Sequence, residues 1–448
     1  MNWNWTEIYQ EAQSYLQELL RFDTTNPPGN ELPALEYLKN ILMRNGVEAE
    51  ILESAPSRGN LVARIPAAHQ QSPPFLLASH VDVVPAEPDQ WKYPPFSGVL
   101  EEGCIWGRGA VDMKTMVIFE VMAMILFQRR GIPLNRDLIL AIVADEEAGG
   151  DFGMKWLVEN HPEKIRAEYS FNEVGGFSLE VGSERVYPIQ VAHKGALWLE
   201  VVFKGRPGHG SMPHDENPVL KLGKAIDSLA KPFPMKPLPL ARQFLSALGK
   251  SSGIGSRILL ALLTFPGLGE WILALLPKEK KNYINALLRN TVTPTGLKGS
   301  QKANVIPSEA SIILDCRTLP GSNHQEFVKA LKKRIGEECE IRVIHDLGPY
   351  AFEPWDSEIF QIIKETILLN DSQARVTPSL TVGFTDAKHL EPLGVKTYGF
   401  FPLKLPSGFR FGELFHGHNE RIPISSFQWG LKVFIEALQK ILSPSSPA

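Results

Sequence analysis

Three short apolar runs in the first half of the chain each end in histidine, amide or carboxylate side chains. The runs are residues 75–79, 138–144 and 169–171, and their endings are His80 and Asp82, then Asp145, Glu146 and Glu147, then Asn172 and Glu173. Apolar runs of this length are typical of buried strands, and open α/β sheets bind ligands outside the carboxyl ends of their strands. We therefore expect the three endings to meet at one edge of one sheet, which is how a metal site is assembled from distant parts of a sequence.

The residues around these runs favour an α/β arrangement. Leu61–Ile65 predicts a strand that pairs with the strand ending at His80. A glycine-rich turn at Trp106–Lys114 leads into a mostly apolar helix at about residues 115–128. Such a helix is buried on most of its surface and holds Asp112 near its N-terminus.

The length of the chain and a change in its pattern indicate an inserted domain. A chain of 448 residues is too long for one ordinary hydrophobic core. The middle of the chain predicts two half-exposed antiparallel strands and two helices, at residues 189–204, 310–317, 218–230 and 323–335. After about Pro349 the alternation of strands and helices returns. The sequence therefore predicts an α/β domain in two parts, residues 1–190 and 349–448, around a smaller α+β domain at residues 191–348.

Composition excludes several classes of protein. The formal charge of −4 gives no reason to expect a nucleic-acid partner. Cys104, Cys316 and Cys339 are odd in number and widely spaced, which is typical of reduced thiols in an intracellular protein. The first residues show no basic stretch followed by a long apolar stretch, so we expect no secretion signal and a cytoplasmic location.

One segment, Arg257–Leu276, is unusually apolar. Pro266, Gly267, Gly269 and Glu270 divide it into two pieces that are each too short to span a bilayer, so no transmembrane segment is expected. One interpretation is a pair of packed helices within the inserted domain. The other is an apolar wall for a fatty or aromatic substrate group, or an interfacial contact.

The candidate metal ligands are five residues drawn from distant parts of the sequence: His80, Asp112, Glu147, Glu173 and His416. If Asp112 bridges two ions, one ion can take His80 and Glu173 and the other Glu147 and His416. Each ion then has three protein ligands and an open position, as catalytic zinc requires. Such a pair favours a bridging hydroxide as a nucleophile.

Two further carboxylates complete this predicted site. Glu146 is next to Glu147 but faces elsewhere, which suits a general base. Asp82 has the same facing as His80 on an extended chain and could hold the imidazole in one tautomer.

These motifs together resemble those of the M20 metallopeptidase family. The matching stretches are Ser79–Pro85, Gly107–Lys114, Asp145–Gly150 and His416–Arg421. The resemblance covers nearly the whole chain and implies a three-layer catalytic domain around a mostly parallel mixed sheet, holding two Zn²⁺ ions or Co²⁺ or Mn²⁺ in their place. It also implies an inserted lid domain that forms a homodimer. The ligands and the base that it implies are those deduced above.

The resemblance also assigns roles to residues of the inserted domain. His209, in Gly205–His214, matches a lid histidine that enters the partner subunit's active site and polarises the scissile carbonyl. Asn304 matches a residue that contacts the oxyanion or the substrate. Arg317 either binds the substrate carboxylate by a bidentate fork or forms an ion pair at the end of a strand.

The sequence thus predicts a dizinc hydrolase that cleaves an amide bond of a small substrate bearing a carboxylate, either an N-acyl amino acid or a short peptide. A dipeptidase or aminopeptidase of the same family is the second interpretation, and a metal-free binding protein on this fold is the third. Two features depart from the family pattern. Phe384 stands where a second glycine is common, and the stretch at about residues 231–295 is longer than in the simplest members.

Overall fold

The computed structural model describes residues 3–182, 184–251, 253–265, 267–352 and 354–443. Pro266 of the apolar segment and the end of the predicted 349–448 part lie outside the described residues. The chain forms two compact units. The first comprises residues 1–191, 352–379 and 385–448, and the second comprises residues 192–351 and 380–384.

The first unit contains a large sheet, a small three-stranded sheet and the helices around them. Its helices are α1 (Trp5–Leu19), α2 (Leu32–Arg44), α3 (Lys114–Arg130), α4 (Met154–Asn160), α5 (Pro162–Ile165), α12 (Glu358–Asn370), α13 (Ala387–Leu390) and α14 (Ile424–Leu442). Short 3₁₀ turns are η1 (Pro88–Gln90), η2 (Glu146–Ala148), η3 (Glu391–Leu393) and η4 (Phe411–Glu413). The strands are β1 (Ala49–Ala55), β2 (Arg58–Ile65), β3 (Phe75–His80), β4 (Val99–Glu101), β5 (Cys104–Trp106), β6 (Leu138–Val143), β7 (Tyr169–Asn172), β8 (Leu179–Val181), β9 (Glu184–His193), β17 (Arg375–Thr381), β18 (Lys396–Gly399) and β19 (Arg421–Pro423).

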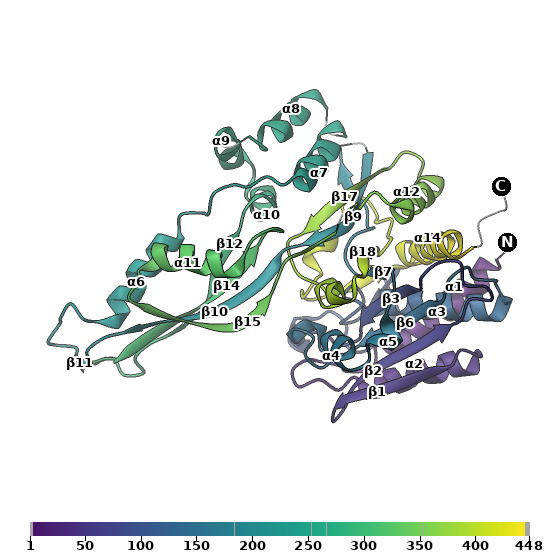
Figure 1. Ribbon diagram of the computed structural model, residues 1–448, viewed down its shortest axis with the longest axis horizontal. Helices are drawn as coiled ribbons and strands as arrows, with labels where there is room; N and C mark the ends of the chain where they lie inside the picture. The colour runs from purple at the N-terminus through teal and green to yellow at the C-terminus, as the bar shows by residue number, and fades with distance from the viewer. Residues whose placement is uncertain (1–2, 183, 252, 266, 353, 444–448) are drawn as a thin grey trace. The chain divides into compact units, whose positions relative to one another are not determined.

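The large sheet confirms the prediction of a mixed α/β fold. Its strands follow the order β1-β2-β6-β3-β7-β18-β9, and β8 and β17 also pair with β9 (Figure 1). The four central strands β6, β3, β7 and β18 are parallel, and β2 and β9 pair antiparallel with the two ends of this group. The carboxyl ends of β6, β3 and β7 therefore lie side by side, as the three apolar runs predicted.

One predicted pairing is wrong. Leu61–Ile65 in β2 pairs with Leu138–Ile142 in β6 rather than with β3. The reason lies in the connection that follows β3: the chain crosses over through α3 and returns as β6, parallel to β3. This return places β6 on the edge of β3 that β2 would otherwise have used.

Apolar layers cover both faces of the large sheet. On one face, Leu76 and Ile139 pack with Met154 and Leu157 of α4. On the other, Phe171 lies 5.8 Å from Phe434 of α14, measured between ring centroids. Helix α3 is buried from Lys114 to Phe127, so the prediction that it is buried on most of its surface is confirmed.

The second unit is a two-layer α+β structure. Its strands are β10 (Gly195–Lys204), β11 (Gly208–His209), β12 (Thr291–Lys298), β13 (Val305–Ile306), β14 (Glu309–Thr318), β15 (Cys339–Leu347) and β16 (Tyr350–Ala351). Its helices are α6 (Pro218–Leu229), α7 (Pro239–Lys250), α8 (Ile254–Leu262), α9 (Leu268–Leu275), α10 (Lys278–Leu288) and α11 (His324–Ile335). The main sheet has the antiparallel order β12-β14-β10-β15, and α6 and α11 pack on one face of it.

The predicted single strand at 189–204 is two strands. Strand β9 ends at His193, and most of its residues belong to the first unit. Strand β10 begins at Gly195 and belongs to the second unit. The apolar alternation runs through the break because both segments are extended, so the sequence pattern alone could not reveal it. Between them, the backbone N–H of Lys194 donates to the carbonyl of Thr381 in the second unit.

The apolar segment forms the two short helices α8 and α9. None of the helices in the described part of the chain combines the length and the apolarity that a bilayer span needs.

Candidate metal centre

The five expected ligands lie together in the first unit, three of them at the carboxyl ends of parallel strands. His80 is the last residue of β3, Glu147 lies in η2 after β6, and Glu173 follows β7. Asp112 lies in the loop before α3, and His416 lies in the loop before β19.

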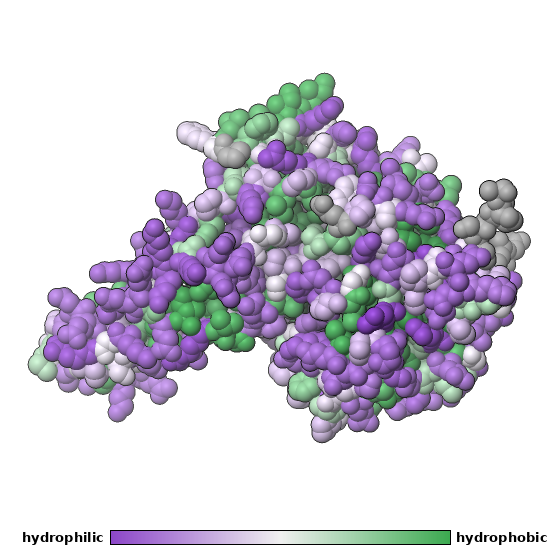
Figure 2. Space-filling view, viewed as in Figure 1, coloured by the Kyte–Doolittle hydropathy of each residue, from purple (hydrophilic) through white to green (hydrophobic). Residues whose placement is uncertain are grey.

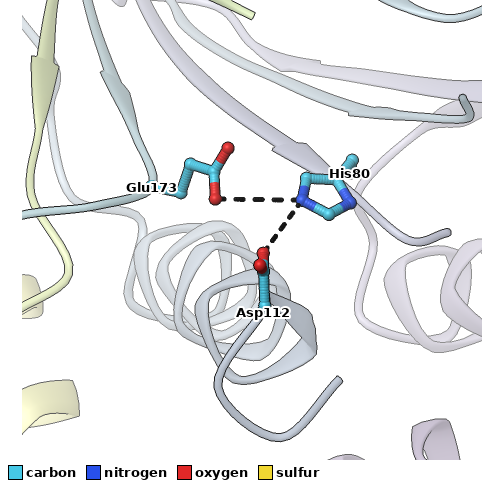
Figure 3. Close-up of side chains that lie close together, drawn as sticks. All are labelled: His80, Asp112 and Glu173. Atoms are coloured by element: carbon cyan, nitrogen blue, oxygen red, sulfur yellow. Dashed lines mark ion pairs between the residues drawn. The ribbon is translucent and has the colours of Figure 1, made fainter. Parts of the chain in front are cut away.

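Asp112 lies between two histidines, with one carboxylate oxygen facing each. Its Oδ1 is 3.3 Å from Nε2 of His80, and its Oδ2 is 3.3 Å from Nε2 of His416. On the first side, Oε2 of Glu173 is 3.9 Å from the same nitrogen of His80 (Figure 3). On the second side, Oε2 of Glu147 is 3.1 Å from Nε2 of His416. The result is two sets of three potential ligands that share Asp112, and within each set the ligand atoms lie within 4.8 Å of one another.

Glu146 belongs to neither set. Its carboxylate lies 3.9 Å from Nε2 of His80 and is buried. It therefore faces the same space as the ligand atoms.

Asp82 connects the ends of β3 and β6. Its carboxylate accepts hydrogen bonds from the backbone N–H groups of Glu146 and Glu147, at 3.1 and 3.2 Å. Nδ1 of His80 lies 3.0 Å from the main-chain oxygen of Asp82 and 3.4 Å from its carboxylate. With Nδ1 donating to these oxygens, the lone pair of the imidazole is on Nε2, the nitrogen that faces Asp112.

Glu420 holds the loop that carries Asp112. Its fully buried carboxylate accepts from the backbone N–H groups of Gly109, Val111 and Asp112, at 3.0, 2.6 and 3.0 Å. It also accepts from Nη1 of Arg108 at 2.9 Å. Four donors on one carboxylate fix the backbone of this loop, and hence the direction of the Asp112 side chain.

A second network holds the loop of η2 from the opposite side. The amide of Asn26 donates to both Asp82 and Asp145, at 2.9 and 3.0 Å. Arg58 donates to Asp145 at 2.8 Å and to Glu31 at 2.8 Å. The buried guanidinium of Arg58 thus lies next to Asp145 and Glu31, and it is not among the ligand atoms.

The site contains more negative charge than its own side chains can compensate. Burial raises the pKa of Glu147 and of Glu173 to about 7, and burial together with Glu173 raises the pKa of Glu146 well above its ordinary value. Burial also raises the pKa of Asp386, a neighbour of this cluster, to about 8. Cations bound at the ligand atoms would remove this repulsion.

The pKa values of the two histidines are raised as well, in their case because the neighbouring carboxylates favour the charged imidazole. Asp112 and Glu147 raise the pKa of His416 to about 10. Burial alone would lower the pKa of His80, but Asp112, Asp82 and Glu173 outweigh it and raise the pKa. Burial would likewise raise the pKa of Asp112, but His416 and His80 hold it below its ordinary value.

The backbone is strained at three points of the site. Asp145, Val174 and His416 have φ angles of 69°, 58° and 56°, in the left-handed region that residues other than glycine rarely adopt. Each such residue costs about 1–3 kcal/mol, and such residues cluster at functional sites. Here the strain falls beside Glu146, beside Glu173 and on His416 itself.

The three remaining predicted residues, His209, Asn304 and Arg317, belong to the second unit. His209 is exposed on β11, which pairs with β13, and its Nδ1 lies 2.8 Å from Oγ of Ser211. Asn304 is its neighbour, since the N–H of Gly210 donates to the carbonyl of Asn304 at 2.8 Å. The structure thus brings these two expected residues together on one short ribbon.

Arg317 lies on β14. It forms a two-pronged ion pair with Asp315, at 2.7 and 3.1 Å, and its guanidinium lies 5.4 Å from the ring centroid of Phe384. This contact is the ion pair at the end of a strand, one of the two roles expected for Arg317.

Sequence reasoning gave no role to Glu420, Asn26, Asp145 or Asp386. Glu420 and Asp145 stand inside the motifs that were recognised, so their position next to ligands was an available signal. Asn26 carried no such signal, because it lies outside the four matching stretches.

Comparisons with known proteins point to one protein family. The profile described as "Peptidase family M20/M25/M40" matches residues 76–440. The N-fatty-acyl-amino acid synthase/hydrolase PM20D1 of Xenopus tropicalis is 29% identical over 377 residues, covering 82% of this chain and 72% of that protein. Aminoacylase-1 of Sus scrofa is 25% identical over 449 residues, covering 96% of each. Among solved structures, the M20 family metallo-carboxypeptidase Sso-CP2 from Sulfolobus solfataricus aligns with a TM-score of 0.73 at 20% identity, covering 97% of this chain and 98% of that one.

Proposed function

Because the chain belongs to the M20/M25/M40 peptidase family, we propose that it is a dizinc hydrolase that cleaves the amide bond of a small substrate bearing a free carboxylate. The observation that carries the proposal is the pair of ligand sets that share Asp112. A single set would suit a structural ion as well, whereas two sets joined by one carboxylate are the arrangement of two-metal hydrolytic sites.

The residues present fit two divalent ions. Nε2 of His80 is buried, and among the described residues it has no hydrogen-bond partner, although three carboxylates lie within 4 Å of it. An orphaned imidazole nitrogen facing carboxylates is typical of a metal ligand. His80, Asp112 and Glu173 would hold one ion, and Asp112, Glu147 and His416 the other. When bound, such ions polarise the carbonyl oxygen of a substrate and make water more acidic.

Glu146 would move the proton in this reaction. Its carboxylate faces the ligand atoms without belonging to either set, and its raised pKa makes it a strong proton acceptor once ionised. It would take a proton from the attacking water and deliver it to the leaving nitrogen. Asp82 would keep Glu146 in place through the backbone N–H and would keep His80 in one tautomer.

An N-acyl amino acid is the substrate class that we favour over a short peptide. Support comes from the relatives: one is named for N-fatty-acyl-amino acids and another is an aminoacylase, both with long alignments. A dipeptidase activity is the second candidate, since a protein of the same fold, human carnosine dipeptidase 1, aligns with a TM-score of 0.70.

His209 would polarise the scissile carbonyl of the partner subunit's substrate in a homodimer formed through the second unit. The exposed position of His209 supports a role outside its own unit, and the neighbouring Asn304 would contact the oxyanion or the substrate. We assign Arg317 to the ion pair with Asp315, to which its Nε and Nη2 donate.

We also place the protein in the cytoplasm. Cys104, Cys316 and Cys339 are free and buried, which suits a reducing compartment.

The test is a panel of substrates with a matched inactive variant. The zinc-loaded protein is assayed on N-acyl amino acids with acyl chains from acetyl to palmitoyl, and on dipeptides, beside Glu146→Gln. We expect hydrolysis of N-acyl amino acids by the parent, and a rate lower by about 10²–10⁴-fold in the variant. Hydrolysis of the dipeptides alone would favour the second candidate. Fewer than about one zinc per chain after loading, without activity, would indicate a binding protein.

A further inference from the structure

The outer faces of α8 and α9 carry an exposed apolar surface. Six large apolar side chains are exposed on these helices and on the turn between them: Ile254, Ile258, Phe265, Leu268, Trp271 and Leu275. We call these six residues the α8–α9 surface. The exposed fractions of Ile254, Trp271 and Leu275 are 81, 78 and 79%, so these side chains are almost wholly in solvent. Figure 2 shows apolar residues gathered over these two helices at the top of the view.

The spacing of these residues places them on one side of each helix, with Ile254 and Ile258 four residues apart on α8. On α9, Leu268, Trp271 and Leu275 follow one another at intervals of three and four residues, which places them on one side of the helix. The opposite side is apolar too, because Ile272 and Leu273 are buried. Helix α8 contains no fully buried residue although most of its residues are apolar. A helix that is apolar on both sides normally has both sides covered.

The hairpin is built to present this face rather than to collapse onto it. Gly269 allows α9 to approach α8, since a Cβ atom there would lie 2.4 Å from the carbonyl oxygen of Leu263. The buried Arg289 donates to Glu270 at 2.7 Å and to the carbonyl of Phe233 at 2.8 Å. These contacts hold the polar edge of α9 against the unit, and so they keep Trp271 and Leu275 turned outward.

The rim of the surface is basic. Lys250, Arg257 and Lys278 are exposed, and none of them forms an ion pair with another described residue. Between Pro239 and Lys281 the sequence has six lysines and arginines but two glutamates, whereas the whole chain has a net charge of −4. One of the two glutamates, Glu270, is already paired with Arg289. The local charge is therefore opposite in sign to that of the protein.

We propose that the α8–α9 surface binds the surface of an anionic phospholipid bilayer. Exposed tryptophan and aliphatic side chains beside unpaired lysine and arginine are the combination that inserts into the headgroup region while its cations contact acidic headgroups. The two helices have 9 and 8 residues, so they lie in the interface and do not cross the bilayer. A second copy of the chain fits less well, because a symmetric contact would bring the basic rims of two copies together.

The test is flotation of the full-length protein with lipid vesicles. Vesicles of phosphatidylcholine alone are compared with vesicles that contain about one third phosphatidylserine, in about 0.1 M and about 0.5 M NaCl. We expect flotation with the anionic vesicles and its loss at high salt. Trp271→Ser/Leu275→Ser should lower the partition coefficient by at least about tenfold, because it removes two inserted apolar side chains. Lys250→Glu/Arg257→Glu should abolish the preference for phosphatidylserine.

The matched control is Leu297→Ser/Leu369→Ser, which replaces two leucines of similar exposure outside this surface, at 64 and 75%. It should float like the parent. The proposal is overturned if the parent does not float with either vesicle, or if the Trp271/Leu275 variant floats as well as the control. It is also overturned if sedimentation velocity without lipid shows a dimer that this variant dissociates, because the surface is then a contact between copies. The Lys250→Glu/Arg257→Glu variant alters only exposed side chains. If the Trp271→Ser/Leu275→Ser variant does not fold, the charge variant by itself tests whether the surface binds anionic lipid. None of these measurements depends on the proposed activity.

Discussion

Glu420→Gln tests whether the buried carboxylate of Glu420 positions the loop that carries Asp112. Oε1 of Glu420 accepts from the N–H groups of Val111 and Asp112, and Oε2 accepts from Gly109 and Arg108. Glutamine keeps the volume but replaces one of these oxygens by an amide nitrogen, which cannot accept. Either orientation of the amide therefore leaves two donors without an acceptor.

The substitution also leaves the buried guanidinium of Arg108 without its counter-charge. Removing one partner of a buried ion pair costs about 3–5 kcal/mol. For a unit of about 280 residues, the entropy of unfolding is about 0.6 kcal/mol per kelvin, so this loss lowers the melting temperature by about 5–8 °C. Burial raises the pKa of Glu420 above its ordinary value although Arg108 opposes this, so the comparison is made at pH 8, which favours the ionised carboxylate.

The assay combines thermal unfolding by circular dichroism with titration of zinc into the metal-free protein. We expect the lower melting temperature together with a zinc affinity weakened by about 10–100-fold, since mutating a residue that holds a metal ligand in place has effects of this size. Glu413→Gln is the matched control, because among the described residues the Glu413 side chain forms only an exposed pair with Arg410, at 3.4 Å. A change of less than about 2 °C with unaltered zinc affinity would show that the loop keeps its shape without Glu420.

Three further predictions concern the ions, the core and the dimer. Asp112→Ala should lose both zinc ions whereas His416→Ala weakens mainly one, and calorimetric titration that finds two tight sites in the Asp112 variant would exclude a shared ligand. Burial raises the pKa of Glu120 well above its ordinary value, so this group binds a proton more tightly in the folded than in the unfolded state and stability falls as pH rises above about 4.5. Glu120→Gln should therefore raise the melting temperature more at pH 8 than at pH 5, and an equal change at both would refute this account. When inactive His209→Ala and Glu146→Gln proteins exchange subunits, up to about a quarter of the parent activity should return, because half of the dimers are mixed and each has one complete site. No recovery after verified exchange would mean that His209 does not act across the dimer.

The sequence alone determined the elements whose signals are local. The apolar runs before His80, Asp145 and Asn172 identified β3, β6 and β7, because a strand buried on both faces is mostly apolar along its length. The continuous apolar stretch after Asp112 identified α3 for the same reason. Since parallel strands place their carboxyl ends at one edge, these local signals were sufficient to bring His80, Glu147 and Glu173 together.

Only the tertiary structure decided how the site is supported. The bond between Glu420 and the N–H of Asp112 joins residues 308 positions apart, and Asn26 reaches Asp145 across 119. Hydrogen bonds of this kind produce no periodic pattern in the sequence, because any polar residue in a loop could form them. The sequence likewise did not reveal that β6 lies between β2 and β3. The edge of β3 on which β6 pairs depends on the path of the connection through α3.

In the apolar segment too, the sequence determined the helices and the tertiary structure decided their orientation. Its sequence determined that two short helices form, because glycine and glutamate interrupt an otherwise apolar run. The sequence could not determine which side of each helix faces outward. Both sides of α9 are apolar, so the periodicity of apolar residues cannot distinguish them. The packing of Gly269 against Leu263 and the bond from Arg289 to Glu270 decide that orientation, and they leave Trp271 and Leu275 in solvent.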